Sequence, residues 1–251
     1  MPGNLTYFIS DLHLGARYII NKREHEMRIV QWLDSIKHSA GNIYLLGDIL
    51  DYWFEYRCVV PRGFVRFFGK LAELADCGIN IYWMTGNHDI WIFDYLPKEL
   101  GIHLIHGPIT TSIQGKTFLL DHGDNVGEKK LGYAVMRSIF RNRLCQWLYA
   151  GIHPRWTIPF ATGWSKSNRV CRNEAKIQQE IDFGMNALTT FSEQYSAAHP
   201  EVDYFIYGHL HTMVDKTLTT GKRMLVIGEW INSCSYVVFD GSDLKLLKIT
   251  Q

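Results

Sequence analysis

Apolar and polar residues follow two different patterns in the first hundred positions of the chain. Short apolar runs at Leu5–Ser10, Ile43–Gly47 and Ile79–Thr85 predict buried β-strands. Between these runs, apolar residues recur at helical spacing over residues 21–38 and 62–77. Alternating strands and helices favour right-handed crossovers and a mainly parallel sheet.

The pattern then changes to short strands that follow one another closely. Three of them precede residue 122, with a tight turn expected at Gly115-Lys116: Ile102–His106, Ile109–Ile113 and Thr117–Asp121. Five more follow residue 200, the last four expected as a β-meander: Val202–Tyr207, Val214–Thr219, Arg223–Gly228, Ser235–Phe239 and Leu244–Ile249. This order predicts an α/β sandwich, two sheets covered by helices, in a single domain over residues 1–251.

Residues from about 125 to 200 interrupt the strands and are expected to form an inserted helical cap or lid. A helix is predicted over residues 130–150. Pro154 and Pro159 are predicted to break the helical pattern, and helix is expected to resume over about residues 168–183. This insertion also has a strong net positive charge. Residues 129–176 hold ten basic residues and one acid, a net charge of +9 against −8 for the rest of the chain.

Composition narrows the class of protein. A hydrophobic content of 47% is ample for a sizeable core, and the net charge of +1 predicts no strongly charged partner for the chain as a whole. The 5 cysteines are scattered without a CxxC pair, which indicates reduced thiols in a cytosolic type of compartment. We recognise no signal peptide at the N-terminus and no stretch apolar enough to cross a bilayer.

Residues of the types that bind metals stand at the ends of the predicted strands. A carboxylate such as Asp48, directly after a buried strand, is costly to desolvate unless it is paired or bound to a metal. Parallel strands bring their carboxyl ends to one edge of the sheet. The seven candidate ligands are Asp11, His13, Asp48, Asn87, His122, His209 and His211.

These seven side chains comprise two carboxylates, one amide oxygen and four imidazoles. If Asp48 bridges two ions, each ion has four protein ligands. Carboxylate and imidazole without thiolate suit Mn, Fe or Zn, and the hardness of the donors favours Mn²⁺. Each of these residues alone is common in loops, but seven of them, each at the end of a predicted strand, predict a dinuclear site.

Together these motifs resemble those of the calcineurin-like metallophosphoesterases. They are Asp11-x-His13, Gly47-Asp48-x-x-Asp51, Gly86-Asn87-His88-Asp89, His122 and Gly208-His209-x-His211. The resemblance implies a β-sandwich flanked by helices and a two-metal centre in which a metal-activated hydroxide attacks phosphorus in line. One metal would be held by Asp11, His13, Asp48 and His211, and the other by Asp48, Asn87, His122 and His209.

Two further residues receive catalytic roles. His88 is a candidate to hydrogen-bond the phosphate or to protonate the leaving oxygen. Asp51 matches the family position that orients such a histidine. The same resemblance implies that Asn87, His88 and His209 contact the substrate.

The insertion must choose the substrate, since the core motifs define only the chemistry. Basic residues interleaved with aromatic ones fit nucleic acid, an anionic membrane surface, or one amphiphilic phosphorylated molecule. The alternative is a cap that buries its apolar side. Bulky apolar residues such as Trp147, Trp156 and Phe160 favour a surface that holds lipid, and make nucleic acid an unfavoured partner.

The layout of the whole chain is similar to the UDP-2,3-diacylglucosamine diphosphatase family of lipid A synthesis. That resemblance implies hydrolysis of a nucleotide-sugar lipid to lipid X and UMP by a peripheral enzyme on the cytoplasmic face of the inner membrane. It implies no obligate protein partner, and it nominates Ser165, Ser167 and Arg169 of the lid as substrate contacts. The chain has His88 where many members carry arginine, and Lys130 where an acidic contact is expected.

Two other functions remain open at this point. The first is a phosphodiesterase that acts on a nucleotide or nucleic acid, against which the apolar character of the insertion argues. The second is a non-catalytic scaffold with the same fold. Scaffolds of this kind usually lose ligands, and none of the seven is missing here.

Overall fold

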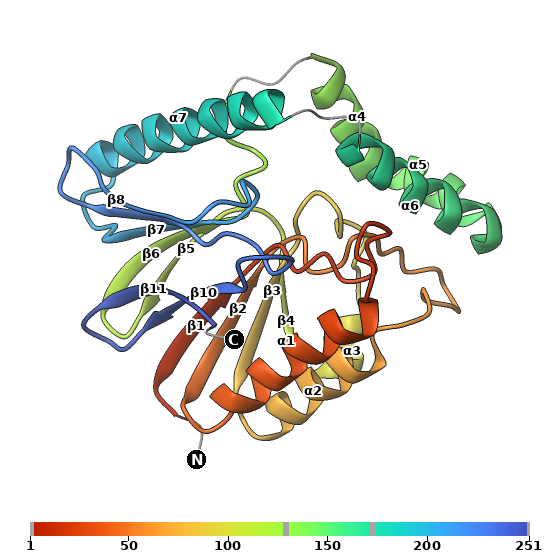
Figure 1. The fold of residues 1–251 in the computed structure, drawn as a ribbon, viewed down its shortest axis with the longest axis horizontal. Coiled ribbons are helices and arrows are strands. Elements are labelled where there is room, and N and C mark those ends of the chain that lie inside the picture. Colours follow the sequence, from red (N-terminus) through yellow and green to blue (C-terminus); the bar gives the residue numbers. More distant parts are fainter. Residues whose placement is uncertain (1–2, 128–130, 171–173, 250–251) are drawn as a thin grey trace.

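The computed structural model describes residues 3–127, 131–170 and 174–249. Two sheets lie face to face with helices on their outer faces, which confirms the predicted α/β sandwich (Figure 1). The six-stranded sheet has the order β11-β10-β1-β2-β3-β4, and the five-stranded sheet has the order β5-β6-β7-β9-β8. The core between them contains Phe8 and Leu46 from the first sheet and Phe118 and Ile206 from the second.

The first sheet is built from the strand–helix alternation of the N-terminal half. Its strands are β1 (Leu5–Ile9), β2 (Ala40–Leu46), β3 (Asn80–Met84), β4 (His103–Ile105), β10 (Ser235–Phe239) and β11 (Leu244–Lys248), and its helices are α1 (Lys22–Ile36), α2 (Val65–Asp76) and α3 (Tyr95–Leu100). Strands β1 to β4 are parallel. Side chains alternate along β1, so that Tyr7 and Ile9 pack toward the helices while Phe8 packs between the sheets.

The second sheet differs from the sequence prediction in two respects. Its strands are β5 (Ile109–Ile113), β6 (Lys116–Asp121), β7 (Tyr204–Tyr207), β8 (Val214–Thr217) and β9 (Arg223–Val226). The predicted β-meander is wrong, because β8 and β9 pair in this sheet whereas β10 and β11 pair in the other. The β5–β6 turn is also one residue earlier than predicted, at Gln114 and Gly115, which have φ of 50° and 82°.

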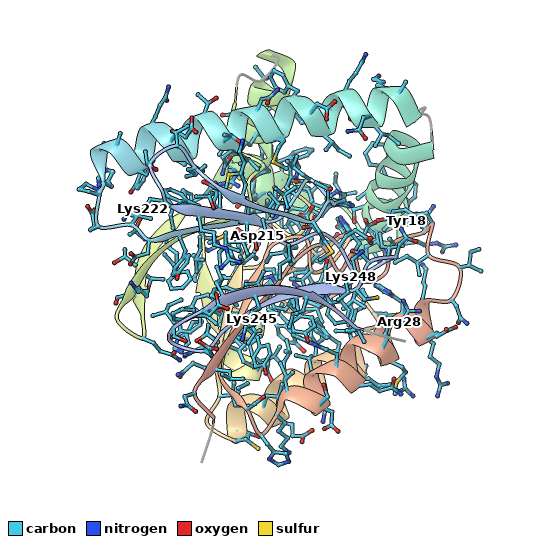
Figure 2. The ribbon with its side chains drawn as sticks, turned by 60° about the vertical axis from the view of Figure 1, so that its left-hand side comes forward. Tyr18, Arg28, Asp215, Lys222, Lys245 and Lys248 are labelled. Carbon is cyan, nitrogen blue, oxygen red and sulfur yellow. The ribbon has the colours of Figure 1, made fainter. Side chains whose placement is uncertain are left out.

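The described residues between β6 and β7 form four helices (Figures 1 and 2). They are α4 (Leu131–Arg141), α5 (Arg143–Ala150), α6 (Pro154–Val170) and α7 (Glu174–Ala198). Pro154 begins α6, where its missing N–H does no harm, but the predicted break at Pro159 is wrong because α6 continues through it. Helix α7 packs on the second sheet through Leu188, whereas α4 to α6 extend away from it (Figure 1). We call α4 to α6 the lid helices.

We call the two sheets with helices α1 to α3 and α7 the body. The lid helices are attached to the body beside the end of the first sheet. Tyr52, Phe54 and Trp91 of the body form an aromatic cluster against Phe140 and Tyr149 of the lid. The indole N–H of Trp91 donates to the Phe140 carbonyl oxygen at 2.8 Å, and the Tyr52 and Tyr149 hydroxyls lie 3.1 Å apart. Among the described residues, none of the helices has both the length and the apolar character needed to cross a membrane.

Candidate metal centre

The loops that follow five strands meet at one end of the sandwich. They follow β1, β2 and β3 of the first sheet and β6 and β7 of the second, and they carry all seven predicted ligands. Of the three groups of potential metal-binding atoms that form there, each within 4.8 Å, two consist of predicted ligands: Asp11, His13 and His211, and Asp48, His122 and His209; the third joins His13 to Asp51 and His88. The grouping agrees with the division between two ions that the motifs imply, while the ligand role of each residue stays a prediction.

Five of the seven candidate ligands have left-handed backbone conformations. Their φ values are 54° for Asp11, 45° for His13, 55° for Asp48, 67° for His209 and 55° for His211. Residues other than glycine rarely adopt this region, and such strain is concentrated at functional sites. Each sharp turn aims a side chain back over the end of its strand and into the shared space.

Asp11 is held so that one carboxylate oxygen points into the first group. Its Oδ2 accepts hydrogen bonds from Ser10 Oγ at 2.6 Å and from the His209 backbone N–H at 2.8 Å. The other oxygen, Oδ1, lies 3.1 Å from His211 Nε2 and 3.7 Å from His13 Nε2. Three potential ligand atoms of different residues therefore converge on one point.

Asp48 lies between the two groups. Its Oδ1 accepts the His88 backbone N–H at 2.9 Å, which directs Oδ2 toward the centre. Oδ2 is 3.4 Å from His122 Nε2 on one side and 4.0 Å from His13 Nε2 on the other. This position, between members of both groups, is the one expected of a bridging carboxylate.

Buried acceptor atoms without hydrogen-bond partners test whether a cation fits. Asn87 Oδ1 and His122 Nε2 are fully buried and make no hydrogen bond with any described residue. The His122 Nδ1–H donates to the Leu46 carbonyl oxygen at 2.9 Å, so Nε2 is the nitrogen that is free to bind a metal. Buried polar atoms are normally satisfied, and these two are satisfied if divalent cations occupy the centre.

The charges of the centre are strongly coupled. Burial alone would raise the pKa of Asp48, but His122 and His88 beside it lower that pKa well below its usual value. Burial alone would lower the pKa of His122, yet the Asp48 carboxylate raises it well above the ordinary value. Burial and the neighbouring His122 together lower the pKa of His209 to about 4. Asp48 thus favours positive charge at His122, whereas the lowered pKa of His209 favours its neutral form, the form in which an imidazole binds a metal.

His88 stands at the open side of this centre and is 21% exposed. Its Nδ1–H donates to the backbone carbonyl oxygen of Asp51 at 3.0 Å, which leaves Nε2 facing the centre, 3.9 Å from Asp48 Oδ2. The Asp51 carboxylate lies 3.6 Å from His88 Nδ1 and 3.4 Å from His13 Nδ1. Asp51 is therefore placed to orient two imidazoles at once.

Supporting residues that the sequence did not single out hold the loops in position. Asp89 accepts the Gly86 N–H at 2.7 Å, the Ile49 N–H at 3.1 Å and the Trp83 indole N–H at 3.2 Å. Burial and the nearby Asp48 raise the pKa of Asp89 to about 6. Its place in the Gly86-Asn87-His88-Asp89 motif was the available signal, but its contacts to distant backbone are visible only in the fold.

The glycines that precede the ligands are required by space. A Cβ added at Gly86 would lie 2.2 Å from Asp48 Oδ1 and 2.5 Å from the Asp48 backbone nitrogen. At Gly208 it would lie 2.5 Å from Ser10 Oγ, and at Gly47 it would lie 2.5 Å from His122 Nδ1. The candidate ligands pack against bare backbone, and no side chain larger than glycine fits.

Replacement of Gly86 by alanine is expected to displace Asp48 and to remove bound metal. The added methyl group meets backbone as well as a carboxylate, so stability should fall by roughly 1–3 kcal/mol. Gly69→Ala in α2 is the control, since a Cβ there meets nothing within 4 Å and should be neutral or slightly stabilising. Elemental analysis and urea denaturation measure both effects. Full metal content in Gly86→Ala would contradict the close packing described above.

Some predicted contacts lie outside what the structure describes. The side chains of Ser165, Ser167 and Arg169 in α6 are not among the described ones, and Lys130 lies between the described ranges. Their proposed contacts with substrate therefore stay predictions. The helix that carries the first three is placed above the body near the metal centre, as Thr162 and Ile158 of α6 face Tyr52 and Leu14 across a cavity.

The fold and the two-group centre define a metallophosphoesterase, and comparison with known proteins agrees. The model of the calcineurin-like phosphoesterase family matches residues 5–213, and the chain belongs to that family. It is 47% identical to a UDP-2,3-diacylglucosamine hydrolase of Porphyromonas gingivalis, over 96% of this chain and 95% of the relative. Proteins with the same name from Nitrosococcus oceani and Pseudomonas putida are 26% and 29% identical, covering 97% and 88% of the chain and 96% and 89% of the relatives.

Proposed function

We propose that the protein hydrolyses the diphosphate of UDP-2,3-diacylglucosamine to give UMP and 2,3-diacylglucosamine 1-phosphate, a step of lipid A biosynthesis. The observation that carries the proposal is a centre fit for two cations beneath an apolar helical lid. Such a centre acts on phosphorus–oxygen bonds, and such a lid suits acyl chains. The nearly full-length similarity to hydrolases of that name supports the same substrate.

The chain's own residues position the diphosphate and handle its charge. Asp11, His13, Asp48 and His211 would hold one divalent ion, and Asp48, Asn87, His122 and His209 the other. When bound, the ions supply an activated water and offset the negative charge of the phosphoryl group. His88 Nε2 reaches the open side of the centre, where it can donate a hydrogen bond to a phosphate oxygen or to the departing oxygen when the ring is protonated.

We propose Mn²⁺ as the bound metal, with Fe²⁺ or Zn²⁺ as alternatives, because the donors are carboxylate, amide and imidazole. Adding Mn²⁺ to chelator-treated protein is expected to raise the melting temperature by about 5–10 °C, since saturation at 100-fold the Kd stabilises by about 2.7 kcal/mol. Differential scanning calorimetry with Mn²⁺, Zn²⁺ and Ca²⁺ measures the shift. A melting temperature unchanged by all three ions would contradict a metal centre.

The lid helices present a large apolar surface. Trp147 and Trp156 are 71% and 72% exposed, and exposed apolar side chains on this scale mark an interaction surface. Arg143 and Arg155 are exposed on the same helices. The other large apolar side chains exposed on these helices or between them are Val135, Ile139, Leu144, Leu148, Ile152 and Phe160. Apolar and basic residues together are typical of interfacial helices, so we propose that the lid contacts the cytoplasmic face of the inner membrane.

The double variant Trp147→Gln/Trp156→Gln is expected to bind anionic vesicles at least about tenfold more weakly, because each indole contributes buried apolar area at the interface. Val65→Gln is the matched control, since Val65 is 76% exposed on the body at the start of α2. Co-sedimentation with phosphatidylglycerol vesicles measures binding. Equal binding by the double variant would show that the lid surface faces something other than a membrane.

One assay tests the proposed reaction against the alternatives. The Mn²⁺-loaded protein is given UDP-2,3-diacylglucosamine, bis-p-nitrophenyl phosphate or single-stranded DNA, and products are separated by chromatography. We expect UMP and the diacylated sugar 1-phosphate from the lipid. Hydrolysis of the generic diester or of DNA, with none of the lipid, would instead favour a phosphodiesterase, and no hydrolysis of any would favour a scaffold.

A further inference from the structure

A cavity of about 460 Å³ opens between the body and the lid beside the metal centre. Its walls come from residues 14–26, Tyr52, residues 61–66 and helix α6, which are distant from one another in sequence. Leu14 and Tyr52 form part of it, and they directly follow His13 and Asp51 in the chain. The cavity therefore starts at the edge of the metal centre and has the size of a small-molecule site.

Positive charge dominates this cavity. Five basic residues and one acidic residue line it, a net charge of +4: Arg17, Lys22, Arg23, Arg62, Arg66 and Glu26. Glu26 is already engaged, because its Oε1 accepts the backbone N–H groups of Arg66 and Phe67, each at 3.1 Å, at the start of α2. Lys22 Nζ is engaged as well, as it donates to the Gly15 carbonyl oxygen at 3.0 Å.

None of the four arginines of the cavity has a carboxylate partner among the described residues. Within the part of the chain that the structure describes, Arg17, Arg23, Arg62 and Arg66 form no ion pair, whereas Arg28 nearby pairs with Glu24 and Arg223 pairs with Asp215. These four arginines are exposed, so water weakens their mutual repulsion, and an anion bound among them would offset what remains. Guanidinium groups bind phosphate oxygens through paired N–H donors.

The cavity also connects to the lid. A Cβ at Gly163 of α6 would lie 3.7 Å from Arg17 Nη1, which places this guanidinium against the helix. On the body side, Phe64 closes on Gly15, where a Cβ would meet the Phe64 ring at 2.8 Å. The cavity thus has exposed cationic side chains along its walls and an aromatic wall at Phe64, whereas the exposed side chains of the lid helices are largely apolar.

We propose that this cavity binds the nucleoside monophosphate half of the substrate, with the arginines holding phosphate oxygens of the diphosphate. The inference rests on the proposed function, since an amphiphilic substrate needs a polar site as well as an apolar one. The acyl chains would lie with the apolar lid residues and the uridine end with the arginines. The diphosphate between them would then cross the metal centre, next to His13 and Asp51.

The test uses the Mn²⁺-loaded protein and the double variant Arg23→Gln/Arg62→Gln. Both side chains are exposed, so the fold should be retained, and Arg57→Gln is the control because Arg57 is exposed on the body but does not line the cavity. Calorimetry measures binding of UMP and of uridine, which lacks the phosphate. We expect the double variant to bind UMP at least about tenfold more weakly, uridine to bind weakly to all proteins, and Arg57→Gln to match the wild type.

Kinetics provide a second readout. The double variant should raise KM for UDP-2,3-diacylglucosamine at least about tenfold while keeping both metals, whereas Arg57→Gln should keep the wild-type KM. The proposed cavity function would be overturned if the double variant bound UMP as tightly as the wild type does, or if it lost only its binding to anionic vesicles. If UMP binding depends on the arginines but the lipid is not hydrolysed, the proposed reaction fails and the nucleotide site stands.

Discussion

Replacing Asp48 by alanine is expected to empty both metal sites and to lower the hydrolysis rate more than about 1,000-fold. The reason is its position, with Oδ2 3.4 Å from His122 Nε2 and 4.0 Å from His13 Nε2. Loss of Asp11 or His122 should instead deplete mainly one site. Metal content after dialysis, measured by elemental analysis, distinguishes these outcomes.

Two control variants make this prediction sharper. Asp48→Asn keeps the oxygen that accepts the His88 N–H but removes the charge, so it should lose metal while remaining folded. Asp34→Asn removes an exposed carboxylate that pairs with Lys70 and should retain both metals. Two-metal occupancy in Asp48→Ala would count against the bridging position.

Replacement of His88 by alanine is expected to lower kcat about 10²- to 10³-fold without changing metal content. The imidazole reaches the open side of the centre through Nε2 and is not one of the seven ligands that the motifs imply. Single-turnover kinetics with the lipid substrate measure the effect. An intact kcat would withdraw the role of His88 as an acid or as a phosphate-binding group.

Asp51→Asn is the matched variant for His88, and its effect should be smaller, about tenfold. The hydrogen bond that fixes the His88 ring goes to the backbone carbonyl oxygen of Asp51, at 3.0 Å, and not to its carboxylate, at 3.6 Å. The asparagine variant keeps that carbonyl group. A loss in Asp51→Asn as large as in His88→Ala would show that the carboxylate itself is required.

The candidate ligands could be selected from the sequence because the signal that marks them is local. An apolar run ends, a glycine allows close packing, and a polar residue follows, as at Gly47-Asp48 and Gly208-His209. The left-handed backbone of Asp11, Asp48 and His209 is not visible in such a pattern, because these residue types adopt it only when the surrounding fold imposes it.

Elements that depend on distant residues were predicted less well. Helix α3 was missed because it is short, contains Pro97, and is preceded by a turn whose backbone N–H groups, together with that of Tyr95, donate to Glu55 from another segment. The β-meander was wrong because alternating residues do not reveal which sheet a strand joins. Between β9 and β10 the chain crosses from one sheet to the other. There the backbone N–H of Trp230 donates to the backbone carbonyl oxygen of Asp11.

The arginine cavity shows the same limit. Arg17, Arg23, Arg62 and Arg66 come from two segments that have no common motif, and their positive charge is diluted in a body that is net negative. Only the packing of residues 61–66 against the loop after β1 brings them to one place. The sequence assigned substrate selection to the basic insertion alone, and the structure adds a cationic wall on the body.

Anomalous X-ray diffraction from crystals grown with Mn²⁺ would test the central claim most directly, because it locates the ions without relying on activity. We expect two anomalous peaks on either side of the Asp48 carboxylate, one among Asp11, His13 and His211 and the other among Asn87, His122 and His209. A single peak, or manganese bound away from Asp48, would contradict the two-metal centre.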